Sequence, residues 1–129
     1  MPSRVVCDKG HGGGRCREAA IEMAKLGRLQ ECERCGQPRR YFVRQTYANY
    51  ETTVEHEVER VARLFSDSEA EDSRYDPMLF LMRNRDTNEQ SVWPFYWGID
   101  RNGRWRVGQF PPLLSVEELK KMIQSLEVS

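Results

Sequence analysis

The sequence predicts an α+β protein, in which a small N-terminal module with an inserted helix precedes an antiparallel β-meander packed with a C-terminal helix. Three observations lead to this fold class. Apolar residues recur at helical spacing over residues 15–27 and again over 115–126. Strand-like runs follow one another between residues 78 and 110. Asn102-Gly103, between two of these runs, is a strong hairpin signal.

Residues 1–50 form the predicted N-terminal module. A glycine-rich loop over 7–14 comes first, and the helix over 15–27 follows it, with Gly27 as its stop. A tight turn over 31–38 then leads into a strand over 40–47, which is rich in aromatic and β-branched residues. The helix has one apolar stripe, made of Cys16, Ala19, Ala20, Met23 and Leu26.

Residues 51–129 form the predicted second domain, which has an α+β composition of its own. Its first segment, 52–65, carries apolar residues at helical spacing, but the apolar residues at even positions also fit a strand, so both remain open. The acidic segment 66–73 lacks any bulky apolar residue and is predicted to be an exposed loop. The meander follows, with strands expected at 78–83, 91–99 and 104–110.

The C-terminal helix is predicted over 115–126. Pro111-Pro112 ends the last strand, and Ser115 with Glu118 forms a capping box that starts the helix. We expect its apolar stripe to pack on one face of the meander. The stripe consists of Val116, Leu119, Met122, Ile123 and Leu126.

Charge is distributed unevenly along the chain. The formal net charge is zero, yet residues 1–50 carry ten basic against five acidic residues, whereas residues 51–129 carry ten against fifteen. Such asymmetry suggests that the N-terminal half faces an anionic partner or docks on an acidic surface. The chain has neither an apolar run long enough to cross a membrane nor a signal-peptide core, so we expect a cytoplasmic protein without a membrane partner.

Cysteine spacing predicts a structural zinc site, because disulfides are rare in a reducing compartment. Cys32 and Cys35 are separated by two residues, which lets one tight turn supply two ligands to a tetrahedral ion. Cys7 is the third predicted ligand. The fourth is His11 or Cys16. The short spacing from Cys7 favours His11, whereas the favourable position of a thiolate at a helix N-terminus keeps Cys16 as the alternative.

The segments 7–11, Cys-Asp-Lys-Gly-His, and 32–36, Cys-Glu-Arg-Cys-Gly, together resemble the half-sites of zinc-ribbon and zinc-knuckle modules. The resemblance covers the N-terminal third of the chain, and the C-terminal part resembles no family. It implies a structural Zn²⁺ ion and, for many such modules, contact with nucleic acid or with another protein. The chain departs from the family pattern in the helix inserted between the two half-sites.

The first functional hypothesis is a nucleic-acid-binding or regulatory module whose zinc is structural. Arginines cluster near the predicted metal, and Tyr41, Phe42 and Tyr47 lie between them in the sequence as stacking surfaces. The arginines that we expect to contact nucleic acid are Arg15, Arg17, Arg34, Arg39, Arg40 and Arg44.

Two other classes of function remain open. A protein-interaction or adaptor module would use the aromatic run 92–97, which is apolar on both faces of a strand, although internal packing explains that run more simply. A small enzyme ranks third. Asp100 with Glu118 and Lys120 faintly resembles a nuclease arrangement, but a hairpin turn and a helix cap already account for these residues. We therefore assign no catalytic residues.

Overall fold

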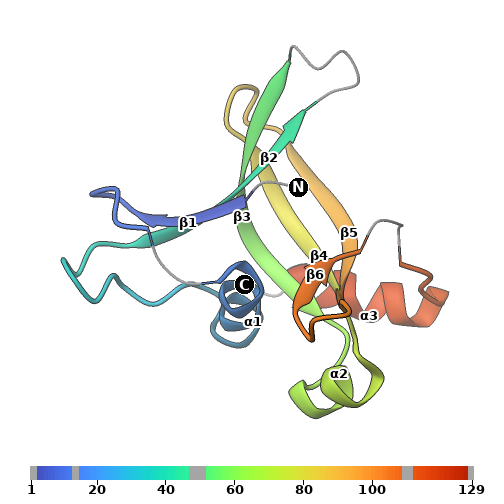
Figure 1. Ribbon diagram of the computed structural model, residues 1–129. Coiled ribbons are helices and arrows are strands. Elements are labelled where there is room, and N and C mark those ends of the chain that lie inside the picture. The colour runs from blue at the N-terminus through green and yellow to red at the C-terminus, as the bar shows by residue number, and fades with distance from the viewer. Residues whose placement is uncertain (1–2, 13–14, 47–51, 109–111, 128–129) are drawn as a thin grey trace.

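The computed structural model describes residues 3–12, 15–46, 52–108 and 112–127 (Figure 1). In this part of the chain six strands form one antiparallel, curled sheet, and each strand pairs with the next one along the chain. The architecture confirms the predicted α+β class. The strands are β1 (Ser3–Cys7), β2 (Arg39–Thr46), β3 (Thr53–Arg63), β4 (Tyr75–Asn84), β5 (Gln90–Ile99) and β6 (Trp105–Val107), and the helices are α1 (Cys16–Leu26), α2 (Asp67–Ser73) and α3 (Val116–Glu127).

Helices α1 and α3 were predicted at nearly their observed bounds. Gly27 ends α1 in the left-handed conformation with φ of 75°, which glycine adopts without steric strain. At the start of α3 the Ser115 hydroxyl accepts a bond from the Glu118 amide at 3.0 Å, and the Glu118 carboxylate accepts one from the Ser115 amide at 2.9 Å. The predicted capping box is therefore present.

Strand predictions were accurate in the second half of the chain and incomplete in the first. Residues 52–65, for which helix and strand both stayed open, form β3. Strand β1 was not predicted, because five residues before a glycine-rich loop are too few to show a period. Some predicted features lie outside the described residues: the strand terminus at Tyr47, the strand terminus at 109–110, loop residues 13–14, and Pro111.

The prediction of a loop over 66–73 is wrong, because Asp67–Ser73 forms helix α2. The Ser66 hydroxyl accepts a bond from the Glu69 amide at 3.3 Å, and the Glu69 carboxylate accepts one from the Ser66 amide at 3.1 Å. Ala70 is fully buried and anchors the helix on the sheet. This capping box is visible in the sequence, but the segment lacks the stripe of bulky apolar residues that indicates a helix packed on a core.

The two faces of the sheet carry different helices (Figure 1). Successive residues of a strand point to opposite faces, so Met78 and Phe80 pack with α1 while Leu79 packs with α3. The core on the α1 face is much the larger, and it includes most of the buried aromatic side chains. Helix α1 contributes Ala19, Ala20 and Met23 to this core.

Helix α3 buries less of its stripe than predicted. Met122 and Leu126 pack against the sheet, but Val116, Leu119 and Ile123 are exposed. The prediction of a fully buried stripe is therefore wrong for these three residues. The physical reason is that α3 rests on β3 and β4 along a narrow line, and nothing in the described part of the chain covers its flanks.

Strands from both sides of residue 50, the predicted boundary between the two units, belong to the same sheet. Strand β2 pairs with β3, with Phe42 opposite Glu57 and Thr46 opposite Thr53. Strands from both predicted units therefore belong to one sheet, and independent folding of residues 1–50 stays a prediction. No helix within the described ranges is both long and apolar enough to cross a lipid bilayer.

Candidate metal centre and adjoining basic residues

One half of the candidate metal centre comes from the loop after β1. Cys7 is the last residue of β1, and the chain turns back immediately after it. The Gly10 amide donates to the Cys7 carbonyl at 2.9 Å, and the Cys7 amide donates to the His11 carbonyl at 3.1 Å. Gly10 has φ of 87°, a backbone conformation that favours glycine. The turn thus presents Cys7 and His11 on the same side.

The other half comes from the turn that precedes β2. The Gly36 amide donates to the Cys32 carbonyl at 2.8 Å, and the Cys32 amide donates to the Gln37 carbonyl at 2.9 Å. These bonds fold the Cys-x-x-Cys segment tightly, so both thiols face the same point. Because Cys7 of β1 lies opposite Arg39 of β2 in the sheet, the two halves meet at one end of the β1–β2 pair.

The four side chains lie close enough together to surround one metal ion, and two of their separations match the edges of a tetrahedral site. The Cys7 and Cys35 Sγ atoms lie 3.6 Å apart, and the Cys32 Sγ lies 3.7 Å from the His11 Nδ1. All four ligand atoms lie within 4.8 Å of one another. Zinc bonds of about 2.3 Å to sulfur and about 2.0–2.1 Å to nitrogen imply tetrahedral edges of roughly 3.5–3.8 Å. Cys7, His11, Cys32 and Cys35 could therefore hold a metal ion.

Local hydrogen bonds shift the pKa values of the two thiols in the Cys-x-x-Cys turn. The backbone amide of Arg34 and the His11 side chain lower the pKa of Cys32 to about 6, against a smaller opposing effect of burial. The backbone amide of Gln37 lowers the pKa of Cys35, but burial and two neighbouring thiols outweigh it and raise that pKa. The turn therefore favours the thiolate, which is the form that binds metal, at Cys32 and disfavours it at Cys35.

Cys16, the alternative fourth ligand, lies outside this cluster. It is the first residue of α1, where its Sγ accepts a hydrogen bond from the Ser3 hydroxyl at 3.1 Å. The side chain is half-buried and packs against the core on the α1 face. All four cysteines are free thiols. The fold therefore brings His11, and not Cys16, together with the other three residues.

His56, the second histidine of the chain, lies far from this centre in the fold. It sits in the middle of β3, and only 6% of its surface is exposed. Neither ring nitrogen has a hydrogen-bond partner among the described residues. His56 is not part of the Cys7, His11, Cys32 and Cys35 cluster, in line with its isolated position in the sequence.

The arginines expected to contact nucleic acid occupy different environments. Arg39 pairs with Glu22 at 3.6 Å, and Arg40 pairs with Asp8 at 3.3 Å, so both have partners within the chain. Arg34 lies in the exposed turn between the two thiols, and with Arg39 it lines a cavity of about 320 Å³ next to the metal ligands. Arg44 is exposed on β2.

The aromatic residues between these arginines are buried. The Tyr41 ring packs edge-on against Phe80 at 5.4 Å between centroids. The guanidinium groups of Arg4 and Arg85 lie 5.0 Å and 4.8 Å from the centroid of the Phe42 ring. Neither Tyr41 nor Phe42 therefore presents a free ring, and Tyr47 lies outside the described residues.

Arg15 and Arg17 lie at the N-terminus of α1, beside a cavity of about 640 Å³. The opposite wall comes from the β5–β6 hairpin, which contributes Arg104, Trp105 and Arg106. No local pattern in the sequence connects this hairpin with the N-terminal arginines, because the two segments are nearly ninety residues apart. The alternating Arg-Trp-Arg pattern was the available signal.

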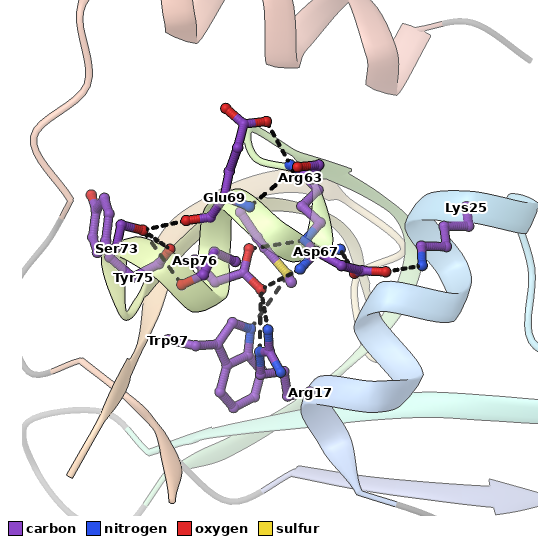
Figure 2. A network of polar contacts seen from close by, with 12 residues as sticks. Arg17, Lys25, Arg63, Asp67, Glu69, Ser73, Tyr75, Asp76 and Trp97 are labelled. Carbon is purple, nitrogen blue, oxygen red and sulfur yellow. Dashed lines mark hydrogen bonds and ion pairs between the residues drawn. The ribbon is translucent and has the colours of Figure 1, made fainter. Parts of the chain in front are cut away.

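A buried carboxylate fixes Arg17. Asp76 is fully buried, and its Oδ2 accepts bonds from the Arg17 guanidinium at 2.9 and 3.2 Å. Arg63 donates to both Asp76 oxygens at 3.0 Å. Arg63 also pairs with Asp67, which Lys25 of α1 contacts at 2.6 Å (Figure 2). This network joins α1, β3, α2 and β4, and no motif in the sequence indicated it.

Comparisons with known proteins identified no relative of this chain. No protein-family model matches the chain, and neither the curated proteins nor the solved structures yielded a match.

Proposed function

We propose that the protein is a small zinc-binding protein whose zinc is structural, and that it binds nucleic acid. The convergence of three thiols and one imidazole within 4.8 Å carries the first part. Three sulfurs and one nitrogen in a tetrahedral arrangement suit zinc. Because protein side chains fill all four positions, no coordination place stays open for a catalytic water. Zinc would then join the turn before β2 to the loop after β1 and add folding energy.

Zinc content tests the ligand set. We expect one zinc ion per chain in the wild type and in Cys16→Ala, because the Cys16 thiol bonds to Ser3 away from the cluster. In His11→Ala we expect zinc affinity to fall by at least about 10-fold, since a three-thiolate site is left incomplete. Elemental analysis after dialysis against a weak chelator measures both. Zinc lost from Cys16→Ala but kept by His11→Ala would contradict the proposed ligands.

Unpaired arginines support the nucleic-acid part of the proposal. Arg15, Arg34, Arg44 and Arg104 have no carboxylate partner among the described residues, so their charges are available to phosphate groups. Arg39 and Arg40 hold ion pairs inside the chain, and we base the proposal on the other arginines. Backbone phosphate contacts of this kind bind nucleic acid without reading its sequence.

Salt dependence tests this part. If about three phosphates are contacted, affinity for single-stranded DNA should fall roughly 20-fold between 50 and 200 mM salt, because counterions are released on binding. Fluorescence anisotropy with a labelled oligonucleotide measures it. We expect Arg34→Glu to weaken binding, whereas Lys120→Glu, the same charge change on exposed α3, should not. Absence of binding even at low salt would contradict the proposal.

The aromatic run 92–97 does not favour the interaction module. Phe95 and Trp97 are buried on the α1 face, and Trp93 stacks on Phe95 with ring centroids 4.4 Å apart. The run thus packs internally. Among its large apolar residues, all of which the structure describes, only Val92 is exposed. Its sequence pattern reflects a core strand.

A further inference from the structure

The cavity of about 640 Å³ between α1 and the β5–β6 hairpin has the size of a small-molecule site, for which about 300–1,000 Å³ is usual. Residues from two distant parts of the chain build it, and the buried network at Asp76 holds one of its walls in place (Figure 2). Neither the metal centre nor the fold requires a cavity at this position. The lining residues therefore indicate what it could bind.

Positive charge dominates the lining. Arg15 and Arg104 have no carboxylate partner among the residues that the structure describes. Arg106 pairs with Asp100 at 3.1 Å on the exposed side of the hairpin, so its charge is partly balanced. Glu18 is the one acidic residue among the lining residues. An anion would therefore meet two uncompensated guanidinium groups, each able to donate in a forked geometry.

Arg17 is already positioned for a ligand. Two hydrogen bonds to Asp76 fix one edge of its guanidinium, and the group stacks over the Trp105 ring with 3.7 Å between its central carbon and the ring centroid. A side chain held in this way loses little conformational entropy when a ligand binds. Arg17 and Trp105 thus form a rigid wall, while Arg15 and Arg104 remain free to close on the ligand.

The first turn of α1 adds backbone donors to the same cavity. Its N-cap residue, Arg15, makes no side-chain cap bond. The amides of Cys16, Arg17 and Glu18 have no hydrogen-bond partner within the described ranges, and all three residues line the cavity. Free amides at a helix N-terminus bind phosphate groups well, because the helix dipole favours negative charge there.

We propose that this cavity binds the phosphate monoester of a nucleotide, with the phosphate at the N-terminus of α1 and the nucleoside against Trp105. A phosphate monoester carries close to two negative charges and three acceptor oxygens, which matches the free guanidinium groups and amides better than a carboxylate does. The half-buried Trp105 supplies the aromatic side chain against which the nucleoside packs, because Trp97 is only 5% exposed. The inference rests on the proposed nucleic-acid binding for its choice of a nucleotide.

Isothermal titration of the zinc-loaded full chain tests the site. The probes are adenosine 5′-monophosphate, adenosine, inorganic phosphate, and one short oligonucleotide with either a 5′-phosphate or a 5′-hydroxyl end. We expect the nucleotide to bind at least roughly 10-fold more tightly than adenosine, because a single hydrogen bond to a charged phosphate group strengthens binding by about that factor. Inorganic phosphate should bind more weakly than the nucleotide, since it makes no contact with the Trp105 indole.

Three charge-reversal variants localise the binding. Arg15→Glu and Arg104→Glu should each weaken nucleotide binding at least roughly 10-fold. Both side chains are exposed and unpaired among the described residues, so we expect the fold to tolerate them. Lys120→Glu is the matched control, an equal charge change at an exposed position of α3 outside the cavity, and it should leave nucleotide affinity within about twofold. Thermal melts check folding in each case.

The oligonucleotide arms separate this inference from the proposed function. If the 5′-phosphorylated strand binds more tightly and Arg104→Glu abolishes that difference, the ligand is the end of a strand. If the nucleotide binds but neither strand does, the ligand is a free nucleotide; that result supports the inference and contradicts only the proposed nucleic-acid binding. Strand binding that ignores the 5′-phosphate, combined with equal affinity for nucleotide and adenosine, would overturn the inference and leave the proposed function standing. Equal effects of Arg104→Glu and Lys120→Glu would also overturn it.

Discussion

Cys35→Ser is expected to lower the melting temperature of the zinc-loaded protein by roughly 10–15 °C. The bound ion would cross-link Cys7 to Cys35, which are 28 residues apart. A cross-link that closes a loop of this size stabilises a fold by about 3–4 kcal/mol, mainly by restricting the unfolded chain. Serine removes a soft ligand and leaves an incomplete site. Calorimetry in the presence of excess zinc measures the shift.

The expected damage is local as well as global. Without the ion, the loop after β1 and the turn before β2 lose their common anchor, so amides of Gly10, Cys32 and Gly36 should exchange with solvent much faster. Cys16→Ser is the matched control, because it makes the same substitution at a thiol outside the cluster, and it should melt within a few degrees of wild type. Identical melting of zinc-loaded and chelator-treated wild type would refute a structural ion.

Asp76→Ala is expected to destabilise the protein by about 3–5 kcal/mol. The carboxylate is fully buried, and it compensates both Arg17 and Arg63, of which the Arg63 side chain is only 6% exposed. Removing it leaves Arg17 without a carboxylate partner and leaves Arg63 only its ion pair with Asp67, so the bonds that both guanidinium groups made to Asp76 stay unsatisfied. Urea denaturation followed by far-UV circular dichroism measures the change in the free energy of unfolding.

Asp67→Ala provides the comparison for this prediction. Asp67 also pairs with Arg63, but its side chain is 57% exposed and its other partner, Lys25, is exposed as well. Because water replaces the lost contacts, we expect a loss under about 1 kcal/mol. Equal destabilisation by the two substitutions would show that burial of Asp76 adds nothing. Nucleotide affinity should also fall in Asp76→Ala, since Arg17 loses the bonds that position it.

Local sequence signals accounted for most of the secondary structure. The stripes of α1 and α3, the Asn102-Gly103 turn and the Ser115–Glu118 capping box each specify an element within a few residues, and the structure confirms these elements. Within the two stripes, Leu26 of α1 and three residues of α3 are exposed. Segment 52–65 remained open, because its apolar residues fit both periods and only pairing with β2 and β4 selects the strand. Its neighbour α2 was missed despite a visible cap.

By itself the sequence determined the fold class and three residues that could hold a metal ion, Cys7, Cys32 and Cys35, while His11 and Cys16 both remained open as the fourth. The spacing of a Cys-x-x-Cys turn is a local feature that needs no tertiary information. Only the tertiary structure separated His11 from Cys16, since β1 pairs with β2 and carries Cys7 to the turn, while α1 carries Cys16 away. It alone also joined Arg15 to Arg104 and buried Asp76 between two arginines, because contacts between distant segments leave no periodic trace in the chain.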